Sequence, residues 1–187
     1  MRTALLLSLS VLSVTLAAAT SPTLPFQVSI NGSIRTSAGE QPATLTVICA
    51  EGKGGALSLQ LRLPGTQLTD YDLDAYEGPG APAAQKPSAH LQIGNLHPVA
   101  KVGGWYTNDQ ADGPLLFVFG IASMSGQSGT AAMVVRALGR TAASLRWTQD
   151  NPQPRGQPLI ASFSPTPEES AQIARISAPC LPAAKRR

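Results

Sequence analysis

The sequence has few of the side chains on which catalytic and metal sites depend. Its 187 residues include two cysteines and two histidines, and only 13% of the residues are charged. The histidines, His90 and His97, lack the His-x-x-x-His and His-Glu-x-x-His spacings that bind metals, and no Gly-x-Ser-x-Gly motif indicates a nucleophilic serine. The sequence therefore predicts a protein that is not an enzyme and that binds no metal or cofactor.

Concentrated positive charge and long apolar runs are also scarce. Fourteen basic and 11 acidic residues give a formal net charge of +3, and the one basic cluster is Lys185-Arg186-Arg187. Without a basic helix or zinc-finger spacing, we expect no nucleic-acid binding. Beyond the N-terminal region, no apolar run approaches the ~18 residues that span a bilayer. We therefore expect no transmembrane segment in the mature chain.

The N-terminal region has the pattern of a secretion signal. Arg2 precedes an apolar run from Ala4 to Leu16, and Ala17-Ala18-Ala19 then offers a small-residue cleavage site. We therefore expect a signal peptide over residues 1–19, cleaved after about Ala19, and a single domain over residues 20–187. Such cleavage would place the mature protein in the periplasm or outside the cell, where disulfides form.

Alternating apolar residues predict an all-β fold. Even-numbered residues between Leu24 and Ile34 share one apolar face, and Asn31-Gly32 within this run suggests a long strand with a glycine bulge. The Gly-rich segment 51–55 separates two alternating runs and predicts a hairpin. Further strands are expected over residues 70–76, 90–96, 99–107, 115–119, 131–138 and 144–148. This succession predicts an antiparallel sandwich or a partly open barrel.

One short C-terminal helix is expected after the strands, over about residues 167–177. Thr166-Pro167-Glu168-Glu169 has the pattern of an N-cap, a proline in the first turn and a capping box. Ile173, Ile176 and Cys180 then share one stripe of this helix, whereas Cys49 lies on the apolar side of a predicted strand. Redox-active pairs usually have the Cys-x-x-Cys spacing. We therefore expect Cys49 and Cys180 to form a structural disulfide that pins the helix across the sheet.

Two segments are candidates for contact with a partner. Asp70, Asp72 and Asp74 would share the solvent face of a strand. They resemble a calcium loop, but its sixth and twelfth positions hold alanine in place of Gly and Glu. A charged stripe that keeps an edge strand soluble is the first interpretation, and a weak cation site or a contact for a basic partner is the alternative. Trp105 and Tyr106 would point to opposite faces of a strand, so one is exposed if the other is buried. The first interpretation is that both fill the ends of the sandwich, and the alternative is that an exposed aromatic contacts a partner or a sugar.

The layout of the cysteines and strands is similar to that of exported bacterial β-sandwich proteins, such as the periplasmic accessory family of type VI secretion clusters. The likeness lies in Leu45-Thr46-Val47-Ile48-Cys49, in the strand from Leu57 to Leu63, and in Phe163 before a helix that ends in Cys180. The resemblance implies a non-enzymatic envelope protein that binds another protein, in an accessory, inhibitor or immunity role. The alternatives are a sugar- or lipid-binding module, which needs an apolar cleft lined by aromatics, and a hydrolase, which needs a histidine beside a serine or carboxylate.

Overall fold

The structure is a computed structural model that describes residues 26–37, 39–52, 54–65, 68, 70–108, 113–140 and 143–183. The predicted signal peptide over residues 1–19 and the basic residues 185–187 lie outside the described residues.

In the described part of the chain, nine strands form one sheet in the order β5-β4-β8-β9-β1-β2-β3-β7-β6. Every neighbouring pair of strands in this sheet is antiparallel. The strands are β1 (Phe26–Thr36), β2 (Gly39–Cys49), β3 (Ala56–Pro64), β4 (Pro87–Ile93), β5 (Val99–Lys101), β6 (Gly103–Thr107), β7 (Leu116–Met124), β8 (Leu145–Gln149) and β9 (Leu159–Phe163).

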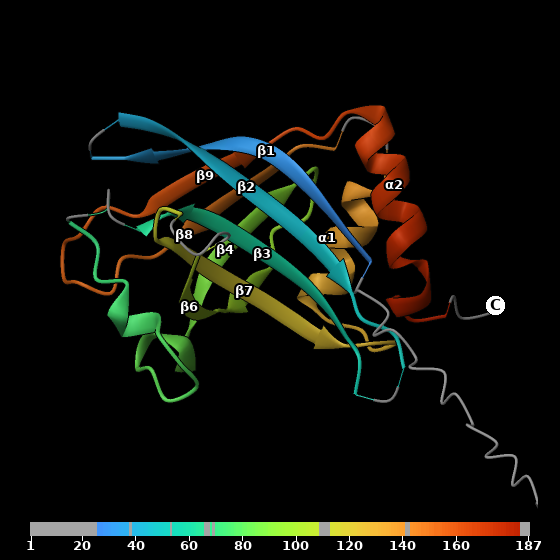
Figure 1. Ribbon diagram of the computed structural model, residues 1–187, viewed down its shortest axis with the longest axis horizontal. Helices are drawn as coiled ribbons and strands as arrows, with labels where there is room; N and C mark the ends of the chain where they lie inside the picture. Colours follow the sequence, from blue (N-terminus) through green and yellow to red (C-terminus); the bar gives the residue numbers. More distant parts are fainter. Residues whose placement is uncertain are drawn as a thin grey trace, which may run out of the picture.

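The sheet curls until its two edges nearly meet. The edge strands β5 and β6 follow one another in the chain with only Val102 between them, so the segment predicted as one strand over residues 99–107 is split where the sheet closes. In Figure 1, β1, β2, β3 and β7 cross in front of β4 and β8 at a steep angle. The fold is mostly antiparallel β, as predicted, with a nearly closed sheet.

The core lies inside the curl and follows the predicted alternation. On β3, Leu57, Leu59, Leu61 and Leu63 are buried, and the residues between them are only partly buried. The predicted hairpin is confirmed, because β2 pairs with β3 from Thr44 opposite Arg62 to Cys49 opposite Leu57.

Two α-helices, α1 (Thr130–Leu138) and α2 (Pro167–Ser177), contact each other and lie at one end of the sheet (Figure 1). The predicted C-terminal helix is confirmed together with its capping box: the Thr166 hydroxyl accepts from the Glu169 amide at 3.2 Å, and Glu169 Oε2 accepts from the Thr166 amide at 2.7 Å. The cysteine pair is also formed. The sulfurs of Cys49, at the end of β2, and Cys180, in the turn after α2, are bonded, and their Cα atoms are 5.8 Å apart.

The helix α1 corrects a prediction, since residues 131–138 were expected to form a strand. Six of its residues are buried, whereas Met133 and Arg136, three positions apart, are exposed. Two exposed residues at this spacing mark one solvent-facing stripe of a helix rather than the alternate positions of a strand.

The segment 70–76 is also not a strand. It forms turns and the 3₁₀ helix η2 (Asp74–Tyr76), and Asp72 Oδ1 accepts a hydrogen bond from the Ala75 amide at 3.3 Å. In a strand, Tyr71 and Tyr76 would point to opposite faces, but both rings are buried and stack with centroids 6.2 Å apart. The three aspartates therefore do not share a strand face, although all three are exposed.

The expected glycine bulge at Gly32 is absent from the described structure. β1 pairs with β2 without a shift of register from Phe26 opposite Cys49 to Thr36 opposite Gly39. Gly32 is instead explained by the close approach of β9, because a Cβ atom at this position would lie 2.2 Å from the Ser162 carbonyl oxygen.

Candidate functional site

The segment that contains η2 lies along the edge strand β6 and brings several predicted contact residues together. The Tyr106 hydroxyl donates a hydrogen bond to Asp74 Oδ1 at 2.8 Å. Glu77 forms an isolated bridge with Gly104, and the Gly78 amide donates to the Gly104 carbonyl at 3.1 Å. The aspartate segment and the aromatic segment, which are distant in the sequence, are therefore neighbours at one edge of the sheet.

Three exposed carboxylates gather at this edge. Asp72, Asp74 and Glu77 are exposed, and within the described residues none of them pairs with a lysine or an arginine. Their effect is visible on Tyr106: burial raises its pKa from 10.0 to about 12, with further contributions from the Asp74 hydrogen bond and from the charges of Asp74, Glu77 and Asp72. The carboxylates therefore produce a negative potential around the Tyr106 hydroxyl.

Trp105 is the large aromatic side chain that this edge exposes. Its ring lies over Gly120, where an added Cβ atom would come within 2.8 Å of the indole Cζ3 atom. The residue is 39% exposed, whereas Tyr106 points the other way and packs edge-on against Phe117. The two adjacent aromatics thus point to opposite faces of β6. We use the name Trp105 face for the surface along the edge strand β6: Trp105 lies on one side of this strand, and Tyr106 lies on the other side with Asp74 bonded to it and Asp72 and Glu77 nearby in the chain.

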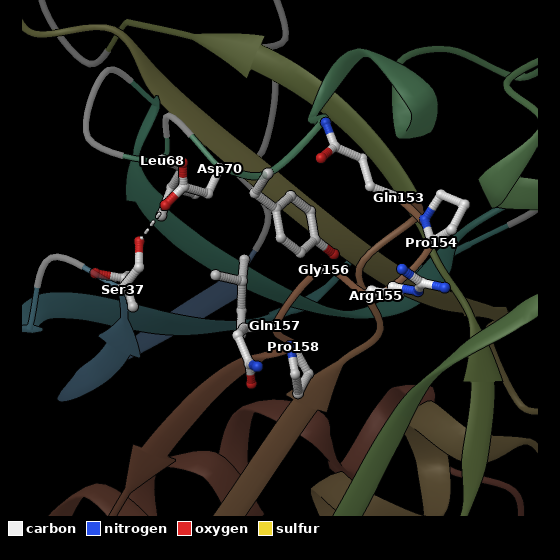
Figure 2. A pocket seen from close by; sticks show the side chains of 12 residues that line it. Ser37, Leu68, Asp70, Gln153, Pro154, Arg155, Gly156, Gln157 and Pro158 are labelled. Atoms are coloured by element: carbon white, nitrogen blue, oxygen red, sulfur yellow. Dashed lines mark hydrogen bonds between the residues drawn. The ribbon is translucent and has the colours of Figure 1, made fainter.

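Asp70 belongs to a different feature, a hollow beside the loop from Asp150 to Pro158. The Ser37 hydroxyl donates to Asp70 Oδ2 at 2.8 Å, and Asn151 Nδ2 donates to the Asp70 carbonyl at 3.1 Å. The hollow has a volume of about 300 Å³ (Figure 2). It is lined by Thr36, Ser37, Leu68, Asp70, Tyr71, Gln153, Pro154, Arg155, Gly156, Gln157, Pro158 and Leu159.

The loop that walls this hollow is held in place by its own side chains. Asn151 Nδ2 also donates to the Gln157 carbonyl at 3.1 Å, and Asn151 Oδ1 accepts from the Gln153 amide at 2.9 Å. Arg155, in the next turn, has φ +69°, in the left-handed region that favours glycine. Sequence reasoning did not identify Gln153, Arg155 and Gln157 as lining residues.

A buried polar network anchors the loop from beneath. The hydroxyls of Tyr71 and Tyr76 both donate to the Asp150 carbonyl, at 2.5 and 2.6 Å. Gln149 Nε2 donates to the Tyr76 hydroxyl at 3.0 Å and to Ser88 Oγ at 2.9 Å, and its Oε1 accepts from Trp147 Nε1 at 3.1 Å. Burial, foremost, raises the pKa of Tyr71 well above its ordinary value. The ring that forms part of the hollow is therefore neutral and fixed in position.

One histidine meets part of the condition stated for a hydrolase. His90 Nε2 lies 3.1 Å from Asp150 Oδ2, in a pair whose side chains are 52% and 50% exposed. Within the described residues, no serine, threonine or cysteine forms a hydrogen bond with either His90 or His97. In the described part of the chain, the pair therefore has an acid–base group and its orienting carboxylate, without a hydrogen-bonded nucleophile.

Two further features bear on other ligands. The described residues contain no group of three or more His, Cys, Asp or Glu side chains placed to hold a metal ion. A second hollow, of about 480 Å³, lies beside α1 and is lined by Leu96, Met133, Arg136 and Arg140 among others, none of them aromatic. Neither this hollow nor the one beside the 150–158 loop, with Tyr71 as its single aromatic, is the aromatic-lined cleft expected of a sugar- or lipid-binding module.

In comparisons with known proteins, no protein family, curated protein or solved structure matches the chain. Among the described residues, no helix has both the length and the apolar character needed to cross a membrane.

Proposed function

We propose that the chain is an exported, non-catalytic protein that binds another protein of the cell envelope through the Trp105 face. The observation that carries the proposal is the exposed indole of Trp105 on the edge strand β6, whose next residue, Tyr106, is bonded to one of three exposed carboxylates that pair with no described cation. Tryptophan is enriched among the residues that dominate binding energies, and surface charge steers partners of opposite sign. The partner surface that fits is basic and has an apolar recess for the indole.

Two further observations support this role. The Cys49–Cys180 disulfide is of the kind that persists in oxidising compartments such as the periplasm. The resemblance of the layout to that of the type VI accessory family favours a protein partner. The identity of that partner would decide whether the protein acts as an accessory, inhibitor or immunity protein.

Site-specific photocrosslinking in the native host tests the proposal. A photoreactive amino acid at position 105 is compared with one at Asn31, which is exposed on β1, four strands away in the sheet. We expect one dominant crosslinked protein from position 105 and none from position 31. Equal crosslinking at both positions, or none at either, would contradict the proposal.

The identified partner then allows the chemistry of the surface to be tested. We expect Trp105→Ala to weaken binding by at least about tenfold, because truncating a central aromatic anchor typically costs about 2 kcal/mol. Asp72→Asn together with Asp74→Asn should slow association and reduce its dependence on salt. Unchanged affinity and unchanged salt dependence in these variants would exclude the Trp105 face as the binding surface.

A further inference from the structure

We infer that the hollow beside the 150–158 loop binds a zwitterionic ligand, an amino acid or a short peptide. Its ammonium group would contact Asp70, and its carboxylate would contact Arg155. This inference is independent of the proposed function, because Trp105 is not among the residues that line the hollow.

The first argument is the arrangement of charge. Figure 2 shows Ser37 and Asp70 on one side of the hollow and Arg155 on the other. Within the described residues, Asp70 and Arg155 form no ion pair with each other or with any other group. The Ser37 hydroxyl is bonded to Asp70 Oδ2, which leaves Oδ1 without a described donor. Asp70 and Arg155 therefore present a negative and a positive charge that are not paired with each other, and these match a ligand that carries both an ammonium and a carboxylate group.

The second argument is the chemistry of the remaining lining. A guanidinium binds a carboxylate through two parallel hydrogen bonds, a geometry that a hydroxyl group does not reproduce. Gln153 and Gln157 add amide groups that can both donate and accept. Leu68, Tyr71 and Leu159 are buried and give the hollow an apolar part for a side chain. A volume of about 300 Å³ is at the lower end of the range for small-molecule sites and suits a ligand of this size.

The third argument is that the wall is already in position. Asn151 bridges Asp70, Gln153 and Gln157, and a Cβ atom at Gly156 would lie 2.3 Å from the Asn151 side chain. This packing holds the Arg155 backbone at φ +69°. Left-handed backbone at a residue other than glycine persists where its surroundings impose it, and such positions cluster at ligand sites. The loop backbone that carries Arg155 and the Asp70 carboxylate that is bonded to Ser37 are therefore held in position before a ligand arrives.

The test is an NMR titration of the full oxidised protein with L-leucine and with L-alanyl-L-alanine. We expect saturable shifts confined to residues around the hollow. N-acetyl-L-leucine lacks the ammonium group and L-leucinamide lacks the carboxylate, so each should bind at least about tenfold more weakly than L-leucine. Three results would overturn the inference. They are the absence of a saturable shift with either zwitterion up to about 10 mM, binding of N-acetyl-L-leucine or L-leucinamide as tight as that of L-leucine, and preferential binding of N-acetylglucosamine.

Variants of the chain provide a second, separate readout. Arg155→Gly removes the guanidinium while supplying the residue that the left-handed backbone favours, and Asp70→Asn keeps an acceptor for Ser37. Both should weaken L-leucine binding by at least about tenfold with no loss of melting temperature for Arg155→Gly. Arg146→Gln, which removes a positive charge from the exposed face of β8, is the matched control and should bind like the wild type. Wild-type affinity in Arg155→Gly would refute the assignment.

Discussion

The Tyr106 hydroxyl donates a hydrogen bond to Asp74 Oδ1 at 2.8 Å, and this bond ties the edge strand β6 to the turn η2. A second tie runs through the backbone, where the Gly78 amide donates to the Gly104 carbonyl. The bond between Tyr106 and Asp74 therefore holds the carboxylates of the Trp105 face beside the strand that carries the exposed indole.

The first prediction concerns the titration of Tyr106. Its pKa is raised from 10.0 to about 12 by burial and by Asp74 and its acidic neighbours. The folded protein thus holds the phenol proton more tightly than the unfolded chain does. The resulting contribution to the free energy of unfolding is fully present below pH 10 and is lost as the pH rises through about 12.

Asp74→Asn should lower the pKa of Tyr106 toward 10.0, without reaching it because the ring stays partly buried. The measurement is tyrosinate absorbance as a function of pH, and Tyr106→Phe identifies the Tyr106 step by deleting it. If Asp74→Asn and the wild type titrate identically, the carboxylate does not act on this hydroxyl in solution.

The second prediction concerns the disulfide. Cys49 and Cys180 are separated by 131 residues, and closing a loop of this length stabilises the fold by up to about 5 kcal/mol in the chain-entropy model. We expect the unreduced protein to have no free thiol. Replacing both cysteines with alanine should lower the free energy of unfolding by about 2–5 kcal/mol, measured by denaturant titration.

Reductant provides the matched control for the disulfide. It should lower the melting temperature of the wild type and leave that of the double alanine variant unchanged. A wild type whose thiols become reactive without any loss of melting temperature would show that the bond contributes little to stability.

Much of the sheet could be predicted because burial alternates along strands such as β3. Leu57, Leu59, Leu61 and Leu63 are buried while their neighbours are only partly buried, so a period of two is visible in the sequence. The same logic placed Cys49 inside, and the capping box marked the start of α2. Local patterns suffice wherever one face of an element is uniformly apolar.

The helix α1 could not be recognised in the same way. Its residues Thr130–Leu138 include two adjacent valines and four alanines or leucines, a run that fits a buried strand as well as a helix. Tertiary packing decides between them: α1 leads into Gly139, where a Cβ atom would lie 3.2 Å from the Ala174 Cβ of α2. Spacings of three and four between the buried residues were the one available signal.

The sequence alone identified only some of the residues in the candidate sites. Trp105 and the aspartates could be named as contact residues, but the bond between Asp74 and Tyr106 joins residues 32 positions apart. The hollow depends on contacts at still longer range, such as the bond from Asn151 to the Asp70 carbonyl across 81 positions. Folding alone brings such residues together, so no local motif indicates that Asp70 and Arg155 line the same hollow.

The third prediction concerns the position of the Trp105 indole, which is tested with alanine substitutions at two paired glycines of β6 and β7. An added Cβ atom at Gly120 would lie 2.8 Å from Cζ3 and 2.9 Å from Cη2 of Trp105, whereas one at Gly103, its partner on β6, has nothing within 4 Å. Gly120→Ala should therefore displace the indole into solvent, and Gly103→Ala should leave it in place. Trp147, the other tryptophan, is fully buried and reports on the core.

Tryptophan emission and its quenching by acrylamide measure this displacement. We expect Gly120→Ala to shift the emission to longer wavelength and to increase quenching, with a stability loss of about 1 kcal/mol because the ring is on the surface and can move. Gly103→Ala should match the wild type in both readouts. If the Trp105 face is the binding surface, Gly120→Ala should also weaken partner binding while Gly103→Ala does not, because the orientation of the indole is altered without removing it. Identical emission from the two alanine variants would mean that the indole does not rest on Gly120 in solution.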